Sequence, residues 1–431
     1  MTVSTPPDQQ ARAVHSRRVM GNTIWLTLSS LGAKALAYAQ FVFVVRTFST
    51  HEVGVYAVCL TGVLFAELVA NLGLDRVVVR EVARLGRGKS KEIFVHSLVL
   101  KISASLAAYV LCLGVFWWLY PEIATPYGAS LFAFLAYVPI SSLARSFESH
   151  FTAIEYMVVP ALSQLAERVV MLAVAIGAWA GLYDFTVFLA AFPLGGMLRL
   201  AIPMTLFWHN PKNSLPFHLS SSQAKDILAD SSWLFGVEVM AVAYFRIDIF
   251  MLSKMADLRD TGLYQAAYKI FDFGIAMFAG YLTAIFPALA KGRSQLQPRL
   301  FFLGALAVFF CFSLPLIVFR QDILLFFKPE YGEAASALAC LMLTLPLVYA
   351  NSLLANFAVA TSKVRQLFFV AIPLLAINIA LNAWLIPQHG IFGAALATLG
   401  SEFVLAMALL IFLKPFTLAP SPVTVMCNKT L

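Results

Sequence analysis

Long apolar segments alternate with short polar connections over most of the 431 residues. Because a helix rises about 1.5 Å per residue, roughly 20 apolar residues span the hydrocarbon core of a bilayer. Segments of this kind are predicted at 19–45, 53–73, 94–119, 127–150, 157–181, 185–208, 230–254, 261–287, 300–320, 333–360, 364–386 and 391–413. The pattern predicts an all-α polytopic membrane protein with about 12 transmembrane helices.

Polar stretches divide this series into two halves. A tail at 1–18 precedes a six-helix bundle at 19–208, and a linker at 209–226 separates it from a second six-helix bundle at 227–413, which a tail at 414–431 follows. The connections between helices are too short to hold a folded soluble domain. Any activity is therefore expected inside the bundles.

Each half also carries a similar turn near its start. Arg46–Cys59 (RTFSTHEVGVYAVC) aligns with Lys254–Ala267 (KMADLRDTGLYQAA) at a constant offset of 208 residues, which pairs Tyr56 with Tyr264 and the glycine two residues before each. Glycine and aromatic residues are common in tight turns between membrane helices, so their match alone is weak evidence. The stronger evidence for a repeat is the match of Arg46 with Lys254 and the constant offset. We interpret the two turns as an internal repeat, an arrangement in which related bundles rock about a central site.

Composition agrees with a membrane protein, since 61% of the residues are hydrophobic and 12% are charged, against about 25% charged in soluble domains. The formal net charge of +8 does not predict a nucleic-acid partner, because Lys and Arg beside apolar spans set membrane orientation. The five cysteines form no C-x-x-C pair, so neither a metal site nor a disulfide framework is predicted. Without H-E-x-x-H or G-x-S-x-G, the sequence predicts no catalytic residue and no cofactor.

The distribution of Lys and Arg predicts the orientation. Most of the 30 basic residues fall in the tails and in the alternate connections on the same side as the N-terminus. The opposite loops hold Arg46, Lys254, Arg259, Arg320 and Lys328. Cytoplasmic loops accumulate basic residues, so both termini are predicted to be cytoplasmic.

Three stretches resemble one family of membrane proteins. They are Gly54–Gly86 (GVYAVCLTGVLFAELVANLGLDRVVVREVARLG), Arg246–Phe273 (RIDIFMLSKMADLRDTGLYQAAYKIFDF) and Gly390–Glu402 (GIFGAALATLGSE). They are similar to segments of the bacterial flippases for O-antigen and exopolysaccharide repeat units, a branch of the multidrug/oligosaccharidyl-lipid/polysaccharide exporter superfamily. The resemblance covers nearly the whole chain.

This resemblance implies a MATE-like, V-shaped pair of six-helix bundles around a central cavity. It also implies a transporter that flips undecaprenyl-diphosphate-linked oligosaccharide across the bacterial inner membrane by alternating access, for O-antigen, capsule or exopolysaccharide synthesis. The expected partners are this lipid-linked oligosaccharide, membrane lipid, and the polymerase and chain-length proteins of the same pathway. Two alternatives stay open: a MATE-type multidrug/cation antiporter, and a membrane glycan polymerase or ligase.

Six cations fall inside predicted spans, where each costs about 2.5–3.5 kcal/mol at the bilayer centre. They are Lys34, Lys101, Arg168, Arg199, Arg246 and Lys269. Lys101 and Arg199 lie within about two turns of the cytoplasmic ends of their spans and are predicted to reach the headgroups. The deeper cations require a cavity or a partner.

We hypothesise that the deeper cations hold the diphosphate of the cargo, because arginine offers a planar fork to phosphate oxygens. The candidate binding residues are Lys34, Arg46, Arg168, Arg246 and Lys269. As alternatives, Arg168 forms a buried salt bridge with Glu167 or a nearby helix, and Lys269 pairs with Asp272 one turn away. Arg246 and Asp248 are two residues apart and cannot pair along one helix face.

Acidic residues in the spans are candidates for coupling to H⁺ or Na⁺. The candidates are Asp248, Asp272 and Glu238, with Glu67 and Glu402 as further acids. Asp248 ranks first because its helix neighbour cannot neutralise it. The alternative is that these acids serve as counterions to the buried cations.

Overall fold

A computed structural model describes residues 29, 31–85, 89–209, 221–290, 307, 310–360 and 364–413. Within these ranges the chain is helical apart from turns, and no strand occurs, as the sequence predicts. The chain divides into two compact units, Met1–Val242 and Ala243–Leu431, which we call unit 1 and unit 2. The division falls inside a long helix, whereas 210–220 of the predicted linker lie outside the described residues.

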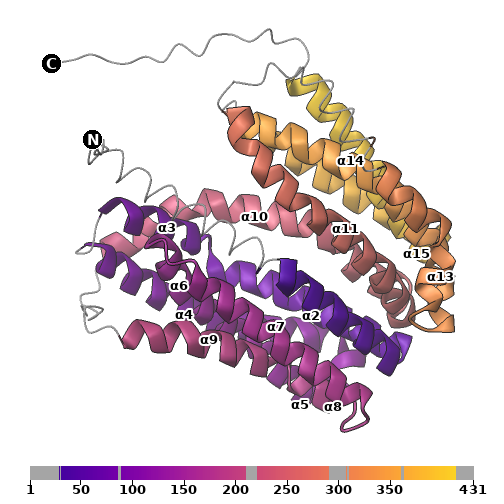
Figure 1. Cartoon of the computed structure of the whole chain (residues 1–431), viewed down its shortest axis with the longest axis horizontal. Helices are drawn as coiled ribbons and strands as arrows, with labels where there is room; N and C mark the ends of the chain where they lie inside the picture. Colours follow the sequence, from indigo (N-terminus) through magenta and orange to yellow (C-terminus); the bar gives the residue numbers. More distant parts are fainter. Residues whose placement is uncertain are drawn as a thin grey trace, which may run out of the picture. The chain divides into compact units, whose positions relative to one another are not determined.

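Unit 1 is a bundle of packed helices (Figure 1). After a helix over residues 31–47, it contains α2 (Thr50–Asn71), α3 (Leu74–Leu85), α4 (Lys89–Leu119), α5 (Pro121–Leu135), α6 (Tyr137–Ala153), α7 (Val158–Trp179), α8 (Phe185–Ala190), α9 (Pro193–Trp208) and the first part of α10 (Ser221–Met255). Helix α6 packs against α4 and α9, and α7 packs against α9. Helix α3 packs against both α4 and α6.

The hydrophobic pattern did not predict helix α3, because this segment lies between the predicted spans 53–73 and 94–119 and was assigned to a polar connection. Leu74, Val77 and Val78 are buried, whereas the side chains of Arg76 and Arg80 are 59% and 51% exposed. A short segment with one apolar and one charged face forms a helix that lies on a bundle without crossing the membrane. A search for long apolar spans does not detect it.

Unit 2 contains the rest of α10, followed by α11 (Leu258–Ala290), α13 (Arg320–Leu325), the 3₁₀ segment η2 (Pro329–Ala334), α14 (Ala335–Ala360) and α15 (Val364–Leu413). Helix α14 packs against α11 and α15 (Figure 1). Helix α15 is two helices joined at Gly390, which takes the left-handed φ of 54° that favours glycine. The predicted break between spans 364–386 and 391–413 is confirmed.

Seven helical segments among the described residues are long and apolar enough to cross a membrane. They are Thr50–Asn71, Lys91–Leu119, Pro121–Ala153, Val158–Trp179, Phe185–Trp208, Pro329–Asn356 and Val370–Ile411, the last of which holds both arms of α15. The predicted total of 12 stays a prediction, because 19–28 and part of 300–320 lie outside the described residues.

The two halves repeat a pair of local contacts. In unit 1 the amide of Gln40 donates to the Tyr56 hydroxyl (3.2 Å), and in unit 2 the Tyr264 hydroxyl donates to Asp248 (2.7 Å). Gln40 and Asp248 are separated by the same 208 positions as the tyrosines. The helix starts also correspond, since matched Ser49 and Asp257 side chains each accept from the backbone amide three residues on. These contacts support the predicted repeat.

The hairpin in α15 yields a test of packing. A Cβ atom added to Gly393 would lie 2.2 Å from the carbonyl oxygen of Leu385, so a side chain forces the two arms apart. We expect Gly393→Ala to destabilise the purified protein by about 1–3 kcal/mol or more, the usual cost of overpacking. Gly114→Ala is the control, because an added Cβ there meets no atom within 4 Å. Equal midpoints of thermal unfolding for the two variants would show that the hairpin contact is unimportant.

Candidate functional site

In unit 2, a charged pair links α10 to α11. The Arg246 guanidinium donates to Asp272 (Nη2 to Oδ2, 2.7 Å), and its carbon lies 5.1 Å above the ring centre of Tyr268. Both charged side chains are largely buried, at 21% and 26% exposure. The pair therefore fixes a positive group on α10 in a defined orientation, held by an ion pair and a cation–π contact.

Asp248 lies two residues from Arg246 and has a different partner. Its carboxylate is buried and accepts from the Tyr264 hydroxyl of α11. The prediction that Arg246 and Asp248 do not neutralise each other along α10 is confirmed, because each contacts a separate residue on α11.

Glu402 on α15 is a second acid held by neutral groups. It is 1% exposed and accepts from the Tyr244 hydroxyl (3.0 Å) and the Asn351 amide (2.7 Å). Within the described residues, neither Glu402 nor Asp248 forms an ion pair. A charged carboxylate buried without a direct cation partner is costly, which distinguishes these two acids from those bound by arginine.

The predicted binding residues of unit 1 occupy different surroundings. Lys34 is partly exposed and Arg46 is exposed, and both lie on the helix over residues 31–47. Arg168 on α7 is partly exposed and lies within electrostatic range of Tyr56 and Tyr137. In unit 2, Lys269 is partly exposed on α11. Convergence of these residues on one cavity with Arg246 stays a prediction.

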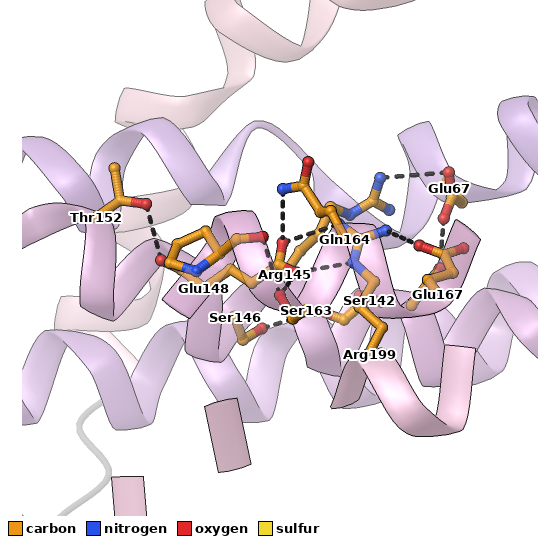
Figure 2. Close-up of polar contacts among 12 residues, drawn as sticks. Glu67, Ser142, Arg145, Ser146, Glu148, Thr152, Ser163, Gln164, Glu167 and Arg199 are labelled. Atoms are coloured by element: carbon orange, nitrogen blue, oxygen red, sulfur yellow. Dashed lines mark hydrogen bonds and ion pairs between the residues drawn. The ribbon is translucent and has the colours of Figure 1, made fainter. Parts of the chain in front are cut away.

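A charge network in unit 1 was missed by sequence reasoning (Figure 2). Arg199 on α9 binds Glu148 on α6 through two parallel hydrogen bonds of 2.8 Å and also reaches Glu167 on α7 at 3.2 Å. Ser163 donates to Glu148 (2.7 Å). Arg145 on α6 pairs with Glu67 on α2 at 3.2 Å. Ion pairs between buried and partly buried side chains thereby join four helices, α2, α6, α7 and α9.

This network and the Lys101–Asp75 pair correct three sequence interpretations. Lys101 is 1% exposed and bonds to Asp75, and Arg199 is 12% exposed, so the prediction that these two cations reach the headgroups is wrong. Position along a span gives depth but does not show which helix lies alongside, and here α3 and α6 supply acids. The proposed Arg168–Glu167 salt bridge is also replaced, because Glu167 binds Arg199 and Tyr137. The sequence signal that could have revealed this network is the presence of two acids, Glu148 and Glu167, within predicted apolar spans.

Glu238 behaves as the counterion alternative predicts. It pairs with Arg76 of α3 at 3.0 Å. Asp272 likewise pairs with Arg246. Among the sequence-predicted coupling residues, Asp248 and Glu402 are held by neutral side chains in the part of the chain that the structure describes, whereas the other three acids pair with arginines.

Comparison with known families decides the assignment. A family model described as "Polysaccharide biosynthesis protein" matches residues 19–293, which is more than half of the chain. The chain belongs to this family. No curated protein sequence matches it. The protein is a multi-pass membrane protein, as its long apolar helices indicate.

Solved structures identify the fold of this family member. Lipid II flippase MurJ in an inward closed conformation matches with a TM-score of 0.71 and 17% identity, over 92% of this chain and 87% of that one. An inward-facing multidrug resistance MATE transporter matches with a TM-score of 0.72 and 13% identity, over 89% and 95%. A mutant of the Vibrio cholerae MATE transporter VcmN matches with a TM-score of 0.60 and 12% identity, over 94% of this chain and 98% of that one. The chain has the fold shared by these transporters.

The charge network makes a quantitative prediction. Arg199→Met leaves Glu148 and Glu167 buried without their cation, and breaking a buried pair in this way costs about 3–5 kcal/mol. We expect a marked fall in the thermal unfolding midpoint of the purified protein. The double variant Arg199→Met/Glu148→Gln should recover part of the loss, because one buried charge is removed. As a control, Arg259→Ala breaks an exposed pair with Glu333 and should have little effect. Similar midpoints for Arg199→Met and wild type would contradict a structural role for the network.

Proposed function

We propose that the protein flips undecaprenyl-diphosphate-linked oligosaccharide repeat units from the cytoplasmic to the outer face of the bacterial inner membrane. Membership of the polysaccharide biosynthesis family carries the proposal. Positive groups inside apolar spans support an anionic cargo, and Arg246 is the best defined of them. The candidate diphosphate-binding residues remain Lys34, Arg46, Arg168, Arg246 and Lys269.

The proposal includes a mechanism of alternating access. Two six-helix bundles, about 12 spans in total, would form a V-shaped pair and rock about a site between them, with both termini in the cytoplasm. The matched contacts of Gln40 with Tyr56 and Asp248 with Tyr264 support two related halves. The names of the structural neighbours describe a flippase and transporters, which supports transport and not catalysis. Polymerase and chain-length proteins of the pathway are the proposed protein partners.

A MATE-type multidrug/cation antiporter is the second candidate, and one observation favours its ion coupling. Asp248 and Glu402 are buried acids with tyrosine or asparagine partners. Such groups exchange a proton or Na⁺ more readily than acids bound by arginine. We therefore propose H⁺ or Na⁺ coupling through these acids for the flippase as well, and a drug-efflux assay separates the two cargoes.

Charge reversal at Arg246 tests the cargo site. Arg246→Glu places a negative charge at the proposed phosphate contact, and we expect polymer export to fall by at least about tenfold, the effect of about 1.4 kcal/mol. Export is measured in a strain that lacks its own flippase, at matched protein levels. Arg246→Glu/Asp272→Arg restores the ion pair with reversed polarity and controls for loss of structure. Normal export by Arg246→Glu would remove this residue from the site.

The repeat provides a matched substitution at Asp248. Asp248→Gln reproduces the Gln40–Tyr56 pair of unit 1, so we expect the unfolding midpoint to stay near that of wild type. If Asp248 carries the coupling ion, Asp248→Gln should export no more cargo than wild type does after collapse of the proton and sodium gradients, and collapsing the gradients should not lower its export further. Retention of full ion dependence in Asp248→Gln would assign coupling elsewhere. The same assay on Glu402→Gln tests the second acid.

A further inference from the structure

A cavity of about 460 Å³ lies in unit 1 between α3, α6, α7 and α9. Its volume is within the range of about 300–1,000 Å³ that is usual for ligand sites. The charged residues that line it are Arg76, Arg80, Arg145, Arg199, Asp75 and Glu148. None of the residues proposed above for cargo binding or ion coupling contributes to this lining.

The lining carries more positive than negative groups. Four guanidinium groups face two carboxylates, and both carboxylates are already bound by buried cations, Asp75 by Lys101 and Glu148 by Arg199. The acids that pair with the other three arginines are Glu238, Glu81 and Glu67, and these acids are not among the lining residues. The lining therefore contains more guanidinium groups than carboxylates, and each of the four arginines keeps an acidic partner.

Arg145 has unused hydrogen-bond donors. A guanidinium carries five N–H groups, and Arg145 uses Nη1 for Glu67. Its Nε and Nη2 atoms are buried and have no acceptor in the described structure. Buried donors of a charged group are costly when unpaired, so this side chain requires a further acceptor.

Arg76 and Arg80 lie on the same exposed face of α3, one helical turn apart, and both are more than half exposed. They begin a basic stretch in which Arg84, Arg87, Lys89 and Lys91 follow. On the predicted orientation this stretch faces the cytoplasmic leaflet, where juxtamembrane basic clusters attract anionic headgroups. Phosphate is the lipid group that matches several arginine forks.

We propose that this cavity binds the phosphate of a lipid, with acceptor oxygens shared between the partly buried Arg145 and the half-exposed Arg76 and Arg80. An anionic phospholipid and the diphosphate of a carrier lipid offer the same chemistry. The inference concerns binding to unit 1 and does not depend on transport. Its test therefore measures binding and can fail while the proposed flipping holds.

Native mass spectrometry of the purified full chain in detergent measures the binding. The probes are phosphatidylglycerol, undecaprenyl diphosphate and, as a lipid without phosphate, diacylglycerol. We expect Arg76→Gln/Arg80→Gln to weaken binding of the two phosphate lipids about tenfold, the loss that corresponds to about 1.4 kcal/mol of charge-assisted hydrogen bonding. Arg259→Gln removes a half-exposed arginine in unit 2 and is the matched control.

Arg145→Gln tests the buried donor in the same assay. Because this change leaves Glu67 without its arginine and could prevent folding, the Arg76→Gln/Arg80→Gln variant provides an independent test. Tighter binding of undecaprenyl diphosphate than of phosphatidylglycerol assigns the cavity to the carrier lipid, and the reverse order assigns it to membrane phospholipid. Either order supports the phosphate site when the arginine variants weaken it. Equal binding by wild type and both variants, or equal binding of diacylglycerol, would overturn the proposal.

Discussion

The cost of placing an ion inside an apolar bundle governs the arrangement of both units. An unpaired charge at the bilayer centre costs about 2.5–3.5 kcal/mol on insertion scales, so packing that places an opposite charge beside a buried ion is favoured. Lys101, Arg199 and Arg246 each contact a carboxylate on another helix. Because one misplaced helix would leave a charge without a partner, these contacts specify how α3 packs against α4, α9 against α6 and α7, and α10 against α11.

The two matched turns share a local contact geometry and differ in its chemistry. Tyr56 and Tyr264 occupy matched helices and each contacts a matched polar residue, but that residue is the amide of Gln40 in unit 1 and the carboxylate of Asp248 in unit 2. The same backbone plan thus supports a permanently neutral pair in one half and a titratable pair in the other. At this matched position the proposed ion coupling is therefore open to unit 2 and not to unit 1.

The sequence predicted features that are local to one helix and missed contacts that form between helices. Apolar segments and the break at Gly390 are local features of the chain, and the structure confirms them within the described ranges. The separate partners of Arg246 and Asp248 followed from helical periodicity alone. Helix α3 was missed because its apolar face is too short to register as a span. The partners of Lys101 and Arg199 come from other helices, and hydropathy along one helix contains no information about its neighbours.

Hydrogen-bond chemistry separates coupling acids from counterions. A tyrosine hydroxyl donates to a carboxylate and accepts from a carboxylic acid, so Asp248 beside Tyr264 and Glu402 beside Tyr244 keep a partner in both protonation states. Arginine only donates, so when an acid held by arginine is protonated, its new O–H finds no acceptor on the arginine and the buried guanidinium loses its counterion. Asp272 and Glu238, which are held by Arg246 and Arg76, therefore suit a fixed charge. On this argument the proposed ion coupling would act on unit 2 through the tyrosine-bound acids, because a ligand shifts a conformational equilibrium only where its binding differs between the states.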